Sequence, residues 1–248
     1  MLSKGRHQTA TGPYFTRVCT STFNRYSLGQ NRYRSFGGLR DEFLSNPKRY
    51  QVASVRASRL RFEDVAQDTK FSLFVRDPRD LIVSGYHYHK KGAEKWCHEK
   101  RPKGSDFDSF GDAPVKDTPS GESYYDHLNR VSVEDGLIAE IKFRKRSFEA
   151  QRHWARIQSV RLLLLKYEDI LGREVEAFRR LASHYELSLI DTQKFLFFAK
   201  RNSAPRKVSQ GGHIRNPSPS QWRSIFSPKV EAFFDEHQGE TMDVLGYA

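Results

Sequence analysis

The stretch from Phe71 to Gly92, FSLFVRDPRDLIVSGYHYHKKG, constrains the fold of this chain more than any other. Its first residues, 71–75, are apolar or β-favouring except for one serine, which is the length and composition of a buried strand. Pro78 then forces a turn and can also open a helix. From Asp80 onward the apolar spacing becomes helical. The stretch therefore predicts a strand that runs through a tight turn into a helix.

The turn between this strand and this helix carries side chains that suit an anion. Arg76 stands at the end of the strand, and Ser84 lies one or two helical turns farther on. Backbone N–H groups at a helix start attract anions, and arginine and serine side chains add donors that suit phosphate oxygens. A purely structural interpretation pairs Arg76 with Asp77 or Asp80. Both interpretations are open on these residues alone.

Three segments, in order along the chain, resemble the PAPS-dependent sulfotransferases, where PAPS is 3′-phosphoadenosine 5′-phosphosulfate. In Arg76–Ser84, the pattern Arg-x-Pro-x-Asp with a serine eight residues after the arginine resembles the family's 3′-phosphate-binding segment. In Leu162–Asp169, four leucines, one lysine and then Tyr-Glu-Asp resemble a strand-end signature whose tyrosine lies near the adenine. In Arg206–Tyr247, a basic loop, a tryptophan and a terminal helix ending in Leu-Gly-Tyr resemble the segment that closes the nucleotide site.

The N-terminal residues Lys4–Thr11 resemble a fourth segment of the same family more loosely. A polar, glycine-containing loop leads into a predicted helix, which is the plan of a phosphate cradle. It is not a Walker A motif, because G-x-x-x-x-G-K-[ST] is absent. The resemblance is to the 5′-phosphosulfate loop, in which Lys4 would match the family's lysine and Thr9 or Thr11 its threonines. Ser3 stands where the family usually has proline.

The resemblance implies a three-layer α/β/α fold with a central parallel sheet, similar to that of P-loop NTPases. We expect one domain over residues 1–248, with a flexible insertion at about 94–122, where Gly, Pro, Asp, Ser and Lys replace any periodic pattern. The four leucines of 162–165 predict a buried parallel strand, and 51–55 predict another strand. From Ser132 the spacing predicts a long, serine-capped amphipathic helix.

Composition narrows the classes of partner and the compartment. The net charge is +12, and bases dominate before Phe62 and between Asp191 and Glu231, where no acid occurs. Such fields attract polyanions, including nucleic acid, acidic glycans, anionic membranes and charged nucleotides. The only cysteines, Cys19 and Cys97, give neither a disulfide framework nor a metal-ligand pattern. No apolar run approaches about 18 residues and no signal peptide is recognised, so the expected location is the cytoplasm.

Residues 20–50 predict a long, arginine-rich loop with short helices, and this loop is expected to border the acceptor site.

Two later regions supply candidates for the base that would deprotonate an acceptor hydroxyl. After the strand predicted at 51–55, the family commonly carries a histidine, but this chain has none there, and Glu63 lies farther along. His87 and His89 lie on the helix after the turn, and histidine is the natural general base near neutral pH. The structural alternative for each histidine is a position on a basic surface helix.

The resemblance implies an enzyme that transfers a sulfuryl group from PAPS to a hydroxyl of a carbohydrate or small molecule, without a metal. The arginine-rich surface suggests an anionic or glycan acceptor, and nucleic acid is not expected as a partner. The implied donor-binding residues are Lys4, Thr9, Thr11, Arg76, Ser84, Tyr167, Arg206, Lys207 and Arg215. The implied catalytic residues are Lys4, which would stabilise the leaving phosphate, and a base drawn from His87, His89 and Glu63.

Two other functions remain open from the sequence. A degenerate, non-catalytic member of the same fold could hold a nucleotide or another polyanion on its basic face, and the irregular loop around Lys4 favours this. A nucleotide kinase of similar fold is the other candidate. The chain lacks the Walker A and Mg²⁺-binding patterns that a kinase would need, so this candidate ranks last.

Overall fold

The computed structural model divides the chain into two compact units, and each is described by itself. Its described residues are 11–25, 31–37, 40–46, 49–55, 57–65, 67–100, 121–202 and 218–247. The strand unit takes its described residues from the segments ending at Arg76 and running from Ile157 to Ser218. The helical unit takes its described residues from Asp77–Arg156 and from Pro219 onward.

All strands of the described chain belong to the strand unit, where they form two parallel pairs. Strand β1 (Tyr33–Gly37) pairs with β2 (Val52–Val55), and β3 (Phe71–Val75) pairs with β4 (Leu162–Lys166). The strands predicted at 71–75, 51–55 and 162–165 are therefore confirmed to within a residue or two. Strand β1 lies within the region predicted to be loop and short helices. Its buried residues, Tyr33 and Phe36, are separated by two exposed polar residues and do not alternate as in a regular strand, so its sequence carries little strand signal.

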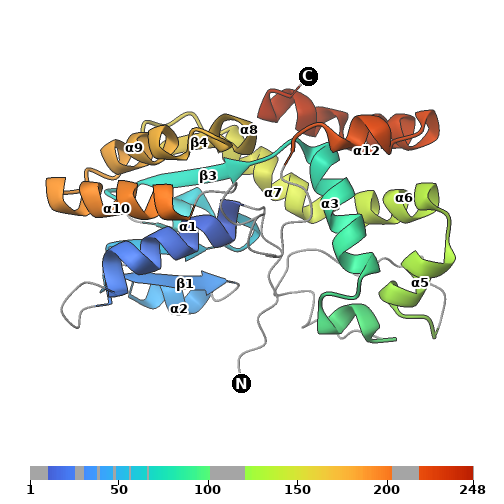
Figure 1. The fold of residues 1–248 in the computed structure, drawn as a ribbon, viewed down its shortest axis with the longest axis horizontal. Helices are drawn as coiled ribbons and strands as arrows, with labels where there is room; N and C mark the ends of the chain where they lie inside the picture. Colours follow the sequence, from blue (N-terminus) through green and yellow to red (C-terminus); the bar gives the residue numbers. More distant parts are fainter. Residues whose placement is uncertain are drawn as a thin grey trace. The chain divides into compact units, whose positions relative to one another are not determined.

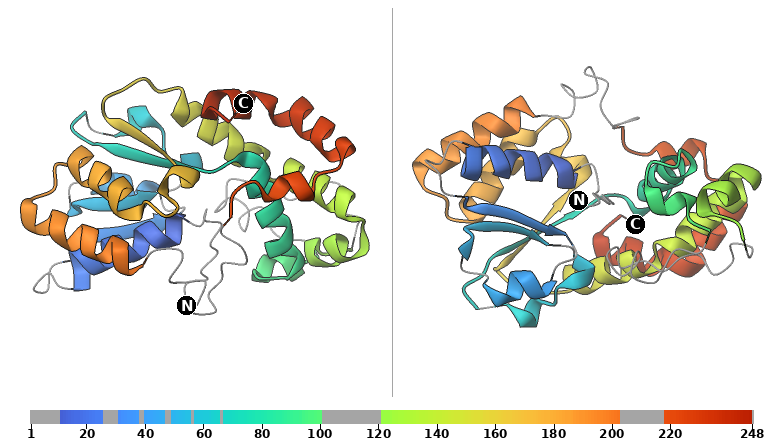
Figure 2. Two further views of the ribbon diagram at one scale, coloured as in Figure 1. Left: turned by 45° about the horizontal axis from the view of Figure 1, so that its top comes forward. Right: turned by 90° about the horizontal axis from the view of Figure 1, so that it is seen from below.

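Helices cover these strands and enclose an aromatic core. Figures 1 and 2 show α1, α9 and α10 gathered along the strands. Rings of Phe15, Phe178 and Phe195 meet in this core, with the Phe178 and Phe195 centroids 4.9 Å apart. The helical segments of the strand unit are α1 (Thr11–Thr20), the π-helix η1 (Ser21–Arg25), α2 (Arg40–Ser45), the 3₁₀ turns η3 (Ala57–Arg59) and η4 (Phe62–Asp64), α8 (Tyr167–Ile170), α9 (Glu174–His184) and α10 (Leu189–Arg201).

The helical unit packs around α3 (Pro78–Lys90), the helix predicted after the turn. The long helix predicted from Ser132 is capped by that serine, which accepts the backbone N–H of Asp135 at 3.1 Å, but it breaks at Arg144 into two helices. The described segments of this unit are α3, the 3₁₀ turn η5 (Lys95–His98), α5 (Tyr124–Arg130), α6 (Val133–Phe143), α7 (Lys145–Ala155), the 3₁₀ turn η6 (Gln221–Ser224) and α12 (Pro228–Leu245).

The start of the predicted insertion at 94–122 belongs to the core of the helical unit. Glu94, Trp96 and Cys97 are buried, and the indole N–H of Trp96 donates to the Glu94 carboxylate. Residues 101–120 lie outside the described residues. The prediction of one domain over 1–248 stays a prediction.

The observed architecture confirms the predicted α/β class with parallel strands. None of the helices in the described ranges combines the length and the apolar character needed to cross a bilayer. Cys19 and Cys97 are both free thiols, and burial raises the pKa of each, to about 12 for Cys97.

An ion pair fastens the entry to β1 onto α10. The Arg32 guanidinium donates to both carboxylate oxygens of Asp191, each at 3.0 Å. This hydrogen-bonded pairing lowers the pKa of Asp191, whose side chain is mostly buried. A carboxyl with a lowered folded-state pKa contributes stability above its unfolded pKa of about 3.9, and that contribution is lost as the pH falls through the folded-state value.

We expect Arg32→Gln to lower the free energy of unfolding at pH 7 by about 1 kcal/mol, because it removes a partly exposed bidentate pair. The difference from the wild type should shrink below about pH 4, where Asp191 becomes protonated. Urea unfolding across this pH range measures it, with the exposed Arg17 changed to Gln as the control. A difference that is independent of pH would show that the pair does not stabilise the fold through the Asp191 charge.

Candidate functional site

The parallel pairing of β3 with β4 brings two predicted site residues together. Val75 lies opposite Lys166 in the register, so the residues that follow, Arg76 and Tyr167, leave the sheet at the same carboxyl edge. The Arg76 guanidinium carbon lies 4.7 Å from the centroid of the Tyr167 ring, which is a cation–π contact. Residues predicted from two separate segments of the sequence are therefore neighbours in the strand unit.

Arg76 is a buried cation at the place where α/β sheets bind ligands. Its exposed fraction is 3%, equal to that of Tyr167, and its Nη2 donates to the backbone oxygen of Ser218 at 3.3 Å. A guanidinium has five N–H donors in a planar fork that matches carboxylate and phosphate oxygens. Burial strengthens its attraction for an anion, because the local dielectric constant is lower than in water. The position and chemistry of Arg76 suit an anionic ligand at the carboxyl edge of the strands.

The turn after Arg76 folds as the sequence predicts. Asp77 is the N-cap of α3, and its Oδ1 accepts the backbone N–H of Arg79 at 2.9 Å. Pro78 opens the helix, where its missing N–H is no loss. The Asp77 carboxylate also accepts from Arg79 Nε at 3.0 Å and Nη2 at 2.8 Å. Asp77 therefore caps the helix and pairs with Arg79. The sequence had offered Arg76 as the partner of Asp77.

A cluster that the sequence analysis did not assign fixes the chain before α12. The Asp80 carboxylate accepts the backbone N–H of Ser220 at 2.7 Å and that of Trp222 at 3.1 Å. The Arg79 guanidinium carbon lies 3.9 Å from the Trp222 ring centroid, and Arg79 Nη2 reaches the backbone oxygen of Tyr247. The sequence did point to Asp80 and Trp222 as residues of interest, because both lie in segments that resemble the sulfotransferases. Their mutual contact was not predictable from spacing.

The other predicted residues lie on several elements of the two units. Ser84 is exposed on α3, and His87 is half-buried on the same helix with its ring centroid 5.2 Å from that of Tyr86. Glu63 is exposed on η4, and Thr11 is the first residue of α1. Arg76 and Glu63 belong to the strand unit, whereas Ser84 and His87 belong to the helical unit. The predictions for Lys4, Thr9, Arg206, Lys207 and Arg215 fall outside the described residues.

His89 has a structural environment that the sequence did not reveal. Its side chain is completely buried, and its Nδ1 donates to Glu140 Oε2 at 2.8 Å. Its ring lies among those of Trp96, Tyr124 and Phe143, with centroid separations of 5.2 Å, 5.7 Å and 5.3 Å. A general base has to reach the proton that it removes. The burial of His89 therefore fits an internal structural role better than the predicted role of base.

Glu140 is the centre of this internal network. Besides His89, its carboxylate accepts from the Tyr124 hydroxyl at 3.1 Å and from Arg144 Nε at 2.7 Å. Burial and the adjacent carboxylate raise the pKa of Tyr124, so this phenol stays protonated as a donor. A buried carboxylate is tolerated only when donors surround it. The sequence carries one indication of this network: Glu140 is an acid on the otherwise apolar face that Leu137 and Ile141 define.

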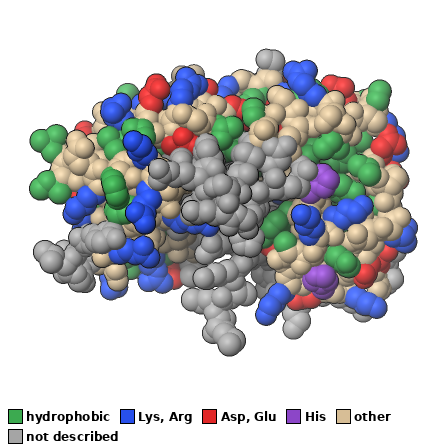
Figure 3. Space-filling model, viewed as in Figure 1, with side chains coloured by type: hydrophobic (Ala, Val, Ile, Leu, Met, Phe, Trp, Pro, Cys, Tyr) green, Lys and Arg blue, Asp and Glu red, His purple; other side chains and the backbone are tan. Residues whose placement is uncertain are grey.

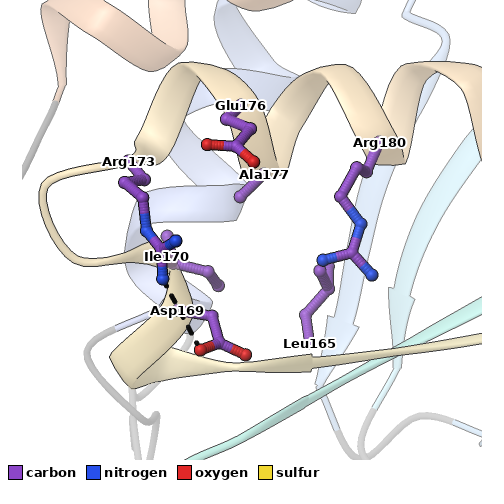
Figure 4. Close-up of a pocket in the computed structure, with 7 residues that line it drawn as sticks. All are labelled: Leu165, Asp169, Ile170, Arg173, Glu176, Ala177 and Arg180. Atoms are coloured by element: carbon purple, nitrogen blue, oxygen red, sulfur yellow. Dashed lines mark ion pairs between the residues drawn. The ribbon is translucent and has the colours of Figure 1, made fainter.

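A surface hollow of about 270 Å³ lies beside β4, α8 and α9. Figure 4 shows its charged side chains around an apolar floor, with Arg173 paired to Asp169 at 3.7 Å. Acidic and basic side chains are balanced around it, and neither Arg76 nor Tyr167 lines it. The hollow is therefore distinct from the Arg76–Tyr167 cluster. Its lining consists of Leu165, Asp169, Ile170, Arg173, Glu176, Ala177 and Arg180.

Within the described ranges, no group of three or more His, Cys, Asp or Glu side chains is arranged to hold a metal ion. The described site residues can bind a ligand through a positive charge and through hydrogen bonds. Arg76 supplies the charge, and Tyr167 supplies an aromatic surface beside it.

Comparison with known proteins shows the family of the chain. Residues 58–246 match the family model described as the sulfotransferase domain. No curated protein is significantly similar in sequence to the chain. A crystal structure of mouse sulfotransferase SULT7A1 complexed with PAP is similar over 94% of both chains, with 13% sequence identity and a TM-score of 0.48.

The match spans most of the chain and includes β3, the turn, α3, β4 and α12. It contains Arg76, Asp80, Tyr167 and Trp222, and it begins after the N-terminal loop that carries Lys4. The chain belongs to the sulfotransferase domain family.

The cluster around Asp80 yields a first test of the site's construction. We expect Asp80→Asn to lower the free energy of unfolding by about 1–3 kcal/mol, because the amide keeps only one acceptor oxygen for the two backbone N–H groups that the carboxylate accepts. Hydrogen exchange of residues 218–226 should accelerate, and urea unfolding should measure the loss. Asp235→Asn, an exposed change on α12, should stay within about 0.5 kcal/mol of the wild type. Unchanged exchange in Asp80→Asn would contradict the anchoring role.

The network around Glu140 yields a second test. Gly85 faces it so closely that an added Cβ would lie 2.0 Å from Glu140 Oε1 and 2.6 Å from Arg144 Nη2. Gly85→Ala should therefore cost about 1–3 kcal/mol of unfolding free energy. Gly239→Ala is the matched control, because it also lies within a helix but meets nothing within 4 Å, and it should gain up to about 1 kcal/mol. Equal effects in the two variants would refute the crowding at Gly85.

Proposed function

We propose that this chain transfers a sulfuryl group from PAPS to the hydroxyl of a carbohydrate or small-molecule acceptor. The observation that carries the proposal is the buried Arg76 guanidinium over the Tyr167 ring, at the carboxyl edge of parallel strands. Both residues lie within the part of the chain that matches the sulfotransferase domain. A cation beside an aromatic ring suits a ligand that has a phosphate next to a purine.

The proposed reaction is an in-line displacement at sulfur. The acceptor oxygen forms a bond to the sulfur while the bond from sulfur to the 5′-phosphate oxygen breaks. The electron pair of the broken bond stays on the phosphate, and the hydroxyl proton passes to a base. The products are a sulfate ester and adenosine 3′,5′-bisphosphate (PAP). Because negative charge grows on the leaving phosphate, positioning and cationic stabilisation should supply most of the catalysis, as in phosphoryl transfer.

We assign the donor's 3′-phosphate to Arg76 and its adenine to Tyr167. The remaining donor-binding assignments rest on the sequence resemblance. Lys4, Thr9 and Thr11 are proposed for the 5′-phosphosulfate, Ser84 and Arg215 for the 3′-phosphate, and Arg206 and Lys207 as supporting phosphate contacts.

The accessibility of the candidate bases distinguishes them. Glu63 is exposed, so solvent reaches its carboxylate. His87 is half-buried, with its Nε2 atom in the interior, whereas His89 is completely enclosed by aromatic rings and bonded to Glu140. Removing the His89 imidazole would leave a buried carboxylate short of a donor and would affect stability rather than chemistry alone. We therefore favour His87 or Glu63 as the base and assign His89 to the internal network.

A non-catalytic nucleotide-binding protein of the same fold is the second candidate. One observation favours it: the family match begins at residue 58, so the loop with Lys4, Thr9 and Thr11 lies outside the matched residues. Without a lysine at the leaving phosphate, PAPS would bind but transfer would be slow. Binding and transfer are therefore measured separately.

We expect PAP to raise the melting temperature of the wild type and Arg76→Ala to bind PAP about 10- to 100-fold more weakly, because a buried charge-assisted contact to phosphate is lost. Arg76→Lys should restore part of the affinity, since it keeps the charge but not the planar fork. Calorimetric titration with PAP at fixed salt measures both variants. Arg146→Ala, which removes an exposed arginine on α7, should bind PAP as the wild type does.

The outcomes separate the candidates. PAP binding together with transfer of labelled sulfate from PAPS to a panel of hydroxylated acceptors supports the enzyme. Binding without transfer selects the non-catalytic protein. No PAP binding at low salt rejects both, and equal affinities of the wild type and Arg76→Ala reject the assignment of Arg76.

A further inference from the structure

The outer face of α10 exposes large apolar side chains that nothing in the proposed function requires. Leu189, Ile190 and Phe197 have exposed fractions of 84%, 70% and 60%. Among the residues that the structure describes, the other strongly exposed large hydrophobic side chains are Val133 and Val160, each on a different segment. The exposure is therefore concentrated on one helix.

The inner face of α10 is apolar as well. Phe195, Phe198 and Ala199 are buried in the core of the strand unit. A helix on the surface of a globular protein normally turns a polar face to water. On α10, however, Ile190 and Phe197 lie seven residues apart, which places them on the same outward stripe. An apolar stripe on the solvent side indicates a surface that another body covers.

Exposed cations lie on α10 and on the helix that packs against it. Lys200 and Arg201 are exposed in the last turn of α10, and Arg179 and Arg180 are exposed on the neighbouring α9. The only acid of α10 is Asp191, which is buried and bonded to Arg32. Figure 3 shows apolar side chains near the α10 edge with Lys and Arg side chains around them. The α10 face thus combines exposed apolar residues with positive charge.

We propose that the α10 face docks onto an anionic lipid bilayer. The helix would lie in the plane of the interface. Ile190, Phe197 and Leu189 would enter the boundary between headgroups and acyl chains, while Lys200 and Arg201 contact lipid phosphates and carboxylates. Amphipathic helices with apolar residues beside lysine and arginine bind membranes in this way, and the attraction grows with the anionic lipid content.

Charge decides between a bilayer and a second copy of the chain. In a two-fold dimer the same patch meets itself, so the cations on each α10 face would approach those on its partner. Like charges across an interface oppose association. A bilayer with anionic headgroups supplies the opposite charge together with an apolar interior, which matches both components of the face. The proposal does not depend on sulfuryl transfer.

The test is sedimentation of the full chain with vesicles of phosphatidylcholine containing about one third phosphatidylserine, compared with pure phosphatidylcholine. We expect the wild type to sediment with the anionic vesicles and not with the neutral ones. The double variant Ile190→Ser, Phe197→Ser should bind at least about tenfold more weakly, because two apolar side chains no longer enter the interface. Lys200→Glu, Arg201→Glu should weaken binding and reduce its dependence on salt.

Matched controls isolate the α10 face from the general basicity of the chain. Val160→Ser removes a side chain that is 96% exposed outside α10, and Lys145→Glu, Arg146→Glu reverses two exposed charges on α7. The Val160 variant should bind the anionic vesicles as the wild type does, and the α7 variant should retain most of the binding. Unchanged melting temperatures exclude misfolding of the α10 variants.

Three results would overturn the proposal. The first is no binding of the wild type to the anionic vesicles. The second is equal binding by the wild type and the Ile190 and Phe197 variant, which would assign the attraction to charge alone. The third is a dimer that light scattering detects in the wild type and that Phe197→Ser abolishes, which would assign the face to a second copy.

Discussion

The candidate site depends on the parallel pairing of β3 with β4. Because Val75 is held opposite Lys166, Arg76 and Tyr167 emerge side by side although they are far apart in the sequence. Side chains alternate along a strand, so a slip of one residue in this register would turn one partner to the opposite side. The contact between guanidinium and phenol ring is thus a consequence of backbone hydrogen bonding, and the continuous apolar runs of the two strands determine that bonding.

The acidic residues of the turn after β3 perform structural work. Asp77 caps α3 and binds Arg79, while Asp80 accepts two backbone N–H groups from the segment before α12. Stacking of Arg79 on Trp222 reinforces the same junction. The short motif Arg-x-Pro-x-Asp therefore encodes two separate functions. Its first residue presents a cation at the strand end, and its last residue secures the C-terminal segment of the helical unit.

Much of the fold was predictable, because its signals are local. Strands β2, β3 and β4 appear as short apolar runs, whereas β1 is interrupted by Arg34 and Ser35 and was missed. The partners of Asp80 and Glu140 lie far away in the sequence, so no spacing rule could pair them. His87 and His89 are equivalent in sequence terms, and only the packing of α3 against its neighbours distinguishes the half-buried ring from the completely enclosed one. The residue types of the site could be recognised from the sequence, but the burial of each side chain could not.

The network around Glu140 also restricts how this protein can diverge. One carboxylate serves His89, Tyr124 and Arg144, and the absence of a Cβ at Gly85 leaves the space that it occupies. Replacing any one member leaves a polar group in the interior without a hydrogen-bond partner, so single replacements are disfavoured. Replacing all members together by apolar residues is tolerable. These positions should therefore vary together among homologous chains. A relative that has lost the glutamate is expected to lack the histidine and the arginine too, and it becomes free to carry a larger residue in place of the glycine.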